Sequence, residues 1–185
     1  MKSKKDTMKT ALLLTGLMAL PASPLHAQKA GGSPASGNPI LVGTDVNQVS
    51  VSTTARPVSQ KRAPDVVLGV LLDDDQQPGK PAKDGKEPTE IELRYYTPRG
   101  HLYETRLVPI GTGSEKERKI DGYPNPVAVA AVQKHGLNGK VWGRVDVTLP
   151  VAGTTISSFG LYGVWRVEAW QNGVAIAKAT FTVTE

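Results

Sequence analysis

The residues of this chain that could carry chemistry are few, and their spacing builds no recognisable site. Cysteine is absent, which excludes disulfides, Cys-ligated zinc, iron–sulfur clusters and thiol catalysis. His101 and His135 each stand beside a turn glycine in separate predicted hairpins, and no third metal ligand is singled out. The aspartates at 73–75 lack the spacing and the glycine of a calcium loop. The sequence therefore indicates no metal site and implies no cofactor.

Catalytic motifs are missing as well. No Gly-x-Ser-x-Gly nucleophile motif occurs, and nothing places a serine beside a lysine as a hydrolase would need. Two carboxylate pairs deserve consideration, Glu90 with Glu92 and Asp146 with Glu168. All four are expected to point outward from strands, where solvated charge is ordinary. The sequence favours a protein without catalytic residues, and an unrecognised hydrolase is the weakest alternative.

Large aromatic side chains on the polar side of predicted strands are the most informative feature. Aromatic and arginine side chains are favoured at contact surfaces because they bury much area at low entropic cost. Two alternatives remain open: a loop or the linker covers these residues, or the register slips by one and they belong to the core. The partner-binding face predicted from strand parity consists of Tyr96, Trp142, Trp170, Arg94, Arg144 and Arg166.

The first 27 residues have the pattern of a secretory signal peptide. Lys2 and Lys5 lie in a positively charged start, 11–20 is an apolar stretch, and Ala27 is a small residue at the expected cleavage position. The apolar stretch is shorter than the roughly 20 residues that span a bilayer. We expect residues 1–27 to be removed on export, with an uncleaved anchor as the alternative and no transmembrane segment after removal.

The charge of the remaining chain is close to balanced. The whole chain has 22 basic and 17 acidic residues, and 1–27 contains four lysines and one aspartate, which leaves 18 basic and 16 acidic residues. The basic pair Lys61-Arg62 is too short a run to suggest nucleic-acid binding. An exported chain without cysteine suits a bacterial envelope, where folding need not depend on oxidation. We expect a periplasmic, secreted or cell-surface protein.

Composition divides the rest into a linker and a domain. Residues 28–64 are rich in Gly, Ser, Pro, Ala and Thr and are predicted to be a low-complexity linker. The apolar residues within 39–51 leave open an edge strand that docks on the domain. Residues 65–185 show short strands separated by turn signals, with long loops at 73–88 and 111–125.

The strand pattern predicts an all-β fold. Asn-Gly turns follow Leu137 and Gln171, and the segment 127–134 is assigned as strand, with helix as the alternative. The simplest architecture is an antiparallel two-sheet sandwich of about seven or eight strands. Predicted strands lie at 66–72, 90–97, 101–109, 127–134, 141–149, 164–170 and 174–184. The predicted core contains Trp165, Val167, Phe181 and Val183, facing Ile91, Leu93, Val145 and Val147.

Two segments resemble bacterial immunoglobulin-like domains, macroglobulin-type modules among them. The phrase Tyr95-Tyr96-Thr97-Pro98-Arg99-Gly100-His101-Leu102-Tyr103 is similar to their strand–turn–strand motif, and Gly163-Val164-Trp165-Arg166-Val167 with Phe181-Thr182-Val183 is similar to their closing hairpin. The resemblance covers about half of 90–185, and it encodes a fold edge rather than a site. It implies an Ig-like sandwich used for binding, spacing or assembly, without catalysis.

These observations combine into one functional expectation. We expect an exported, non-catalytic module of the bacterial envelope that acts through protein–protein interaction with an envelope protein. The alternative is a carbohydrate-binding module that stacks glycan or peptidoglycan sugars on exposed tryptophan and tyrosine.

Overall fold

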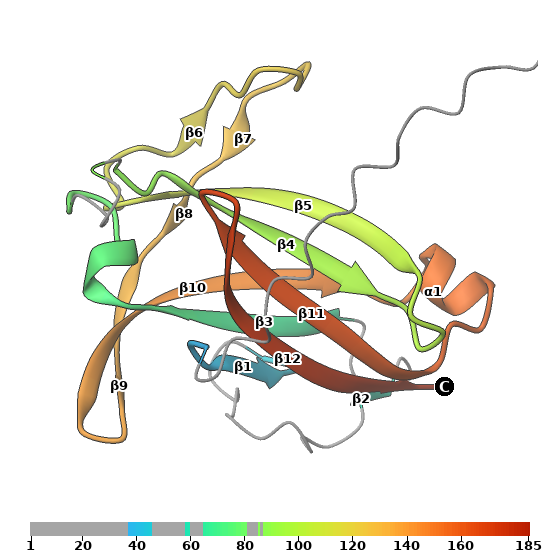
Figure 1. Ribbon diagram of the computed structural model, residues 1–185. Helices are drawn as coiled ribbons and strands as arrows, with labels where there is room; N and C mark the ends of the chain where they lie inside the picture. Colours follow the sequence, from blue (N-terminus) through green and yellow to red (C-terminus); the bar gives the residue numbers. More distant parts are fainter. Residues whose placement is uncertain (1–36, 46–57, 60–64, 81–84, 86) are drawn as a thin grey trace, which may run out of the picture. The chain divides into compact units, whose positions relative to one another are not determined.

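The computed structural model describes residues 37–45, 58–59, 65–80, 85 and 87–185. The described chain is mostly β, with three sheets and one short α-helix (Figure 1). The predicted signal peptide at 1–27 and most of the predicted linker at 28–64 lie outside the described residues.

The first sheet has four antiparallel strands in the order β1-β3-β10-β9. Their bounds are β1 Ile40–Gly43, β3 Asp65–Leu72, β9 Gln133–Leu137 and β10 Lys140–Pro150. Strand β3 lies in the middle and is apolar on both faces, so every residue after Asp65 is buried. This confirms the buried strand that the sequence predicted there.

Strand β1 falls inside the stretch that composition assigned to a linker. It pairs with β3, and its apolar residues Ile40, Leu41 and Val42 are buried. The edge strand that the sequence left open is therefore present over four residues. A short apolar run can join a sheet within a polar, Gly-rich context because pairing to an existing strand satisfies its backbone while its side chains leave water.

The second sheet has six strands in the order β2-β12-β11-β4-β5-β8. Strand β12 pairs in parallel with β2 and β5 in parallel with β8, while the four middle strands are antiparallel. The bounds are β2 Val58–Ser59, β4 Glu90–Tyr96, β5 Leu102–Gly111, β8 Ala130–Ala131, β11 Gly163–Gln171 and β12 Val174–Thr184. Both hairpins predicted from sequence, β4–β5 and β11–β12, are confirmed.

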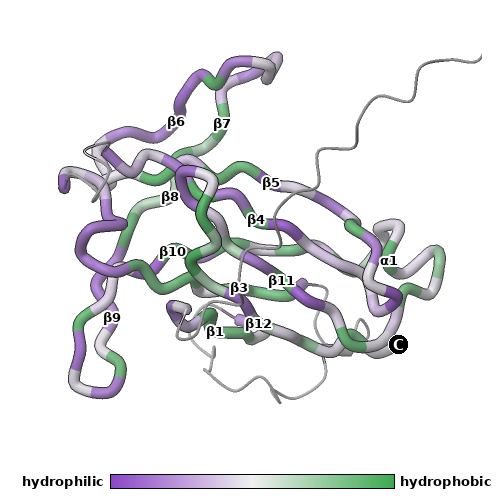
Figure 2. The backbone as a smooth tube through the Cα atoms, viewed as in Figure 1, coloured by the Kyte–Doolittle hydropathy of each residue, from purple (hydrophilic) through white to green (hydrophobic). Residues whose placement is uncertain are grey.

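The segment predicted as one strand over 127–134 is divided among three sheets. Strand β7 (Val127–Ala128) pairs with β6 (Glu117–Arg118) in a two-stranded ribbon, β8 joins the six-stranded sheet, and β9 joins the four-stranded sheet. The prediction of strand rather than helix is confirmed for this segment. The prediction of one continuous strand is wrong, because three separate strands are present. Each short piece pairs where a neighbouring edge is open, so the chain crosses between sheets here. Figure 2 shows hydrophilic residues around β6.

The core lies between the two larger sheets. Trp165, Val167, Phe181 and Val183 are buried, and Ile91, Leu93, Val145 and Val147 belong to the same cluster, which confirms the predicted core. Val141 has the same parity as Val145 but is exposed. The reason is that β3 pairs with β10 only from Gly143 onward, so the start of β10 extends past the body with β9.

The loops contain two short helical turns. A 3₁₀ turn, η1 (Asp74–Gln76), lies in the predicted loop 73–88, and helix α1 (Thr155–Ser158) lies in the predicted loop after β10. Thr154 caps α1, because its side chain accepts a hydrogen bond from the Ile156 amide. Neither helical turn in the described part of the chain is long and apolar enough to cross a membrane.

Candidate binding surface

The six residues predicted to form one face lie on two different sheets. Arg94 and Tyr96 on β4 and Arg166 and Trp170 on β11 point outward from the middle of the six-stranded sheet. Trp142 and Arg144 lie on β10 of the four-stranded sheet. The six residues therefore do not share one sheet, because parity assigns a side to each strand but does not say which strands share a sheet.

The four residues on the six-stranded sheet interlock through stacking. Arg166 pairs directly with Tyr96 across β11 and β4, and its guanidinium carbon lies 3.9 Å from the centre of the Tyr96 ring. The guanidinium carbon of Arg94 lies 4.1 Å from the centre of the Trp170 ring. Both distances are those of cation–π contacts. Each of the two arginines therefore lies over an aromatic ring of the same surface.

Glu168, which the predicted set did not include, links the two stacks. Its carboxylate accepts hydrogen bonds from the Tyr96 hydroxyl at 3.3 Å and from the Trp170 indole nitrogen at 3.4 Å. It also lies 3.5 Å from Nε of Arg166. Its shared parity with Arg166 and Trp170 was visible in the sequence. We call Arg94, Tyr96, Arg166, Glu168 and Trp170 together the aromatic–arginine ladder.

Apolar residues flank one end of the ladder. Leu102 stands directly opposite Tyr96 on β5 and is 56% exposed, and Val164 lies two residues before Arg166 and is 59% exposed. Both point to the outer side because directly paired residues, and residues two apart on a strand, share a face. The outer face of the six-stranded sheet therefore combines exposed aliphatic groups with stacked arginines.

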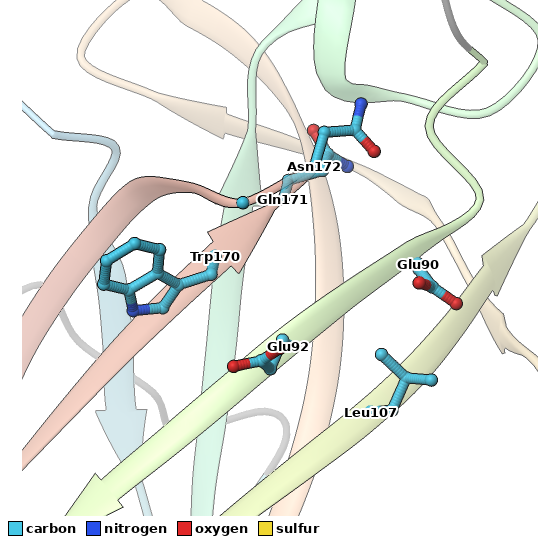
Figure 3. A pocket seen from close by; sticks show the side chains of 7 residues that line it. Glu90, Glu92, Leu107, Trp170, Gln171 and Asn172 are labelled. Atoms are coloured by element: carbon cyan, nitrogen blue, oxygen red, sulfur yellow. The ribbon is translucent and has the colours of Figure 1, made fainter. Parts of the chain in front are cut away.

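A shallow pocket of about 100 Å³ lies at the other end of the ladder. Figure 3 shows Trp170 and Glu92 on neighbouring strands, with Glu90 and Leu107 beyond them. Glu92 is engaged by Arg94, whose Nε lies 2.5 Å from its carboxylate. Gln171 also lines the pocket but is buried, and its amide donates to the backbone carbonyl of Gln76.

The two residues on β10 have a different environment. The ammonium of Lys140 lies 3.7 Å from the centre of the Trp142 ring. Arg144 donates from Nε to Asp146 at 2.7 Å, and its side chain is only 13% exposed. The pair lies over Gly69, where an added Cβ would be 3.1 Å from Nε of Arg144. Arg144 is thus tied into the sheet rather than presented to a partner.

The other chemical candidates show no assembled site. His101 is exposed in the turn before β5 of the six-stranded sheet. His135 is half-buried in β9, which belongs to the four-stranded sheet. Asp73 caps η1 and pairs with Lys140, and Asp74 pairs with Lys80 at 3.0 Å. Over the described residues, no three His, Asp or Glu side chains group as metal ligands.

Local contacts and burial shift the pKa values of Glu115, Arg118 and Tyr95. A hydrogen bond from Arg118 lowers the pKa of the exposed Glu115 carboxyl, and the same bond raises the pKa of Arg118. Burial raises the pKa of the Tyr95 hydroxyl well above its usual range. That hydroxyl lies on the inner side of β4 and has no hydrogen-bond partner. None of these shifts suggests a catalytic acid or base.

Comparison with known proteins adds no relative. No family model, no curated protein sequence and no solved structure gives a significant match to the chain.

Proposed function

We propose that this chain is an exported, non-catalytic Ig-like β-sandwich of the bacterial envelope, and that it binds a protein partner through the outer face of its six-stranded sheet. The contact surface is centred on the aromatic–arginine ladder. Trp142 and Arg144, on the other sheet, are not part of this surface.

The strand orders support the immunoglobulin-like assignment. In constant-type domains, strands A, B, E and D form one sheet and C, F and G form the other, and variable-type domains add C′ to the second sheet. When the strands here are lettered along the chain, β1-β3-β10-β9 corresponds to A-B-E-D. The run β12-β11-β4-β5 corresponds to G-F-C-C′. The short β2, β6, β7 and β8 are additions to that pattern.

The position of the ladder is the observation that carries the proposal. Large aromatic side chains contribute most to stability inside a core, yet Tyr96 and Trp170 stand on the outer side of the two central strands of their sheet. Arginine stacked on an aromatic ring loses little further side-chain freedom when a partner docks, which lowers the entropic cost of association. Tyrosine, tryptophan and arginine are also the residue types that dominate binding energy at protein interfaces.

The same geometry argues against the carbohydrate alternative. A sugar ring stacks on an open aromatic face, but a cation lies over one face of the ring in Tyr96, Trp170 and Trp142 alike. A glycan would have to displace those contacts. A glycan array tests this directly: binding to glycans that Tyr96→Thr/Trp170→Thr abolishes would support the alternative.

Site-specific photocrosslinking tests the proposed surface. A photoreactive amino acid replaces Val164 on the outer face of the six-stranded sheet, and in a matched control it replaces Val141, which is 63% exposed at the start of β10. We expect one dominant envelope protein to crosslink from position 164 but not from 141. Crosslinking from 141 alone would place the contact surface on the other sheet and contradict the proposal.

A pair of variants supplies the second test. Tyr96→Thr/Trp170→Thr removes both rings of the ladder, while Trp142→Thr removes the comparable ring from β10. We expect the double variant to lose capture of the crosslinked partner and the Trp142 variant to retain it. Equal loss in both would contradict the separation of the two surfaces.

Export is tested independently of binding. N-terminal sequencing of the protein from its native host should begin after Ala27. Retention of Met1 in a membrane fraction would contradict the proposed processing.

A further inference from the structure

Arg166 differs from Arg94, the other arginine of the ladder, and from Arg144 on β10 in its contact with a carboxylate. Arg94 donates from Nε to Glu92 at 2.5 Å, and Arg144 on β10 donates to Asp146 at 2.7 Å. Arg166 approaches Glu168 only at 3.5 Å and makes no hydrogen bond within the described part of the chain. One oxygen of the Glu168 carboxylate accepts from Tyr96 and Trp170, and the other lies 3.5 Å from Nε of Arg166, so this ion pair engages the Nε side of the guanidinium.

The free part of Arg166 faces solvent. Its Nε is buried and has no hydrogen-bond partner, whereas the two terminal nitrogens are not among the buried unsatisfied atoms. The side chain is 38% exposed, and its guanidinium is fixed over the Tyr96 ring. The terminal nitrogens of a fixed guanidinium form the planar fork that binds a carboxylate through two parallel hydrogen bonds.

The surroundings of Arg166 determine what kind of carboxylate fits. Exposed aliphatic groups stand on its own strand at Val164 and across β4 at Leu102. They can exclude water once a partner docks, which strengthens the charge interaction. The sheet surface continues past Arg166 onto β12, where Thr180 pairs with it. A partner chain can therefore run across the site, which favours an acidic side chain within a chain over a chain terminus.

Building on the proposed function, we infer that Arg166 is the specificity residue of the surface, and that it binds an aspartate or glutamate side chain of the partner flanked by apolar residues. The ladder holds the fork in place, and Leu102 and Val164 contact the flanking apolar groups. The partner segment thus has an apolar–acidic–apolar pattern.

Short peptides provide a probe that does not require the partner. The peptide acetyl-Leu-Glu-Leu-amide is titrated into the full chain while the side-chain N–H signals of Arg166 are followed by NMR. We expect saturable shifts and an affinity about tenfold higher than for acetyl-Leu-Gln-Leu-amide. The free acid acetyl-Leu-Leu, which offers a terminal carboxylate, should bind more weakly. Equal affinity for the Glu and Gln peptides, or tighter binding of the free acid, would overturn the inference.

Variants that remove one positive charge at different positions distinguish paired hydrogen bonds from the Arg166 guanidinium from general electrostatic attraction to the chain. Arg166→Gln should abolish the preference for glutamate, and Arg166→Lys should retain only part of it because lysine lacks the fork. Arg99→Gln removes the same charge from the exposed β4–β5 turn and should keep the preference. A preference that survives Arg166→Gln, or that is lost equally in Arg99→Gln, would overturn the assignment. Thermal melts establish that each variant is folded.

The photocrosslinked partner distinguishes this inference from the proposed function. If no protein crosslinks at position 164, the proposed surface itself fails. If a protein crosslinks there and Arg166→Gln captures it as well as the unmodified chain does, the surface stands and the role of Arg166 is wrong.

Discussion

Two tryptophans on β11, five residues apart, show how one strand serves both the core and the surface. The Trp165 ring lies 5.1 Å from the Tyr103 ring and 6.2 Å from the Phe181 ring, and its indole nitrogen donates to the Leu161 carbonyl. Trp170, on the other side of the strand, contacts the guanidinium of Arg94 and the carboxylate of Glu168. The inner ring therefore has an apolar and hydrogen-bonded environment, and the outer ring a charged one.

The outer faces of the two sheets differ in a similar way. On the four-stranded sheet, the outward residues Leu41, Val67 and Leu71 are buried despite their position. On the six-stranded sheet, the outward residues Leu102 and Val164 are more than half exposed. The outer face of the four-stranded sheet therefore contributes buried apolar area to stability, while apolar groups on the outer face of the six-stranded sheet stay accessible. Outward parity alone therefore does not identify a contact surface.

The largest expected effect comes from the inner face of β11. Trp165→Ala should lower the free energy of unfolding by about 3–5 kcal/mol, because it removes a large aromatic side chain from a packed core. The melting temperature in thermal denaturation checks this, with Trp170→Ala as the control on the same strand. Comparable losses in both variants would mean that the two faces of β11 are energetically equivalent.

The next effect concerns the outer face of the four-stranded sheet. Asp146→Asn removes the charge of the carboxylate to which Nε of the mostly buried Arg144 donates, and it should cost about 1.5–3 kcal/mol. Glu92→Gln is the matched change on the other outer face, where Arg94 and Glu92 are more exposed, and it should cost less than about 1 kcal/mol. Denaturant unfolding measures both. A larger loss of unfolding free energy for Glu92→Gln than for Asp146→Asn would mean that the outer face of the six-stranded sheet contributes more to stability than that of the four-stranded sheet.

The buried hydroxyl of Tyr95 provides a test on the inner face of β4. Because it has no partner, Tyr95→Phe should raise the free energy of unfolding, by about 1 kcal/mol. The pKa of Tyr95 is raised by burial, so above pH of about 10 the unfolded chain ionises this group while the folded chain does not. Stability attributable to Tyr95 is therefore constant below that pH and falls as the pH rises above it.

Equilibrium unfolding between pH 7 and 11 tests this second effect. The loss at high pH should be smaller in Tyr95→Phe than in the unmodified chain, and Tyr96→Phe serves as the control on the outer side of the same strand. A Tyr95→Phe variant that is much less stable at pH 7 would show that the hydroxyl has a partner.

The ladder should contribute less to stability than the inner face of β11, even when two of its rings are removed together. Tyr96→Thr/Trp170→Thr removes two cation–π contacts at a partly exposed site, each contributing about 0.5–1 kcal/mol. The melting temperature should fall only slightly. Unfolding of the double variant would show that the ladder is structural, and this would remove the main support for a binding face.

Local pattern predicted much of this fold. The alternation in β4 and β11 identified their buried residues correctly, and the Asn-Gly turns lie where the sequence placed them, with Asn138 and Asn172 in the left-handed conformation that such turns use. These features depend on neighbouring residues and on the two-residue period of a strand. Local pattern did not predict that 127–134 divides into several strands, and it left the pairing of β1 undecided. Both depend on which sheet edge has unpaired backbone groups next to a short segment.

The candidate site likewise has features that local sequence predicts and features that depend on strand pairing. Strand parity in the sequence predicted that Tyr96, Trp142 and Trp170 point away from the inner side of their strands, because side-chain direction in a strand follows local parity. The sequence could not predict that Tyr96 and Trp170 share a sheet while Trp142 lies on the other one, since sheet order depends on pairing between strands far apart in the chain. The tertiary structure also sets how closely each arginine approaches its carboxylate, 2.5 Å for Arg94, 2.7 Å for Arg144 and 3.5 Å for Arg166, because that distance depends on strand pairing and on the burial around each pair.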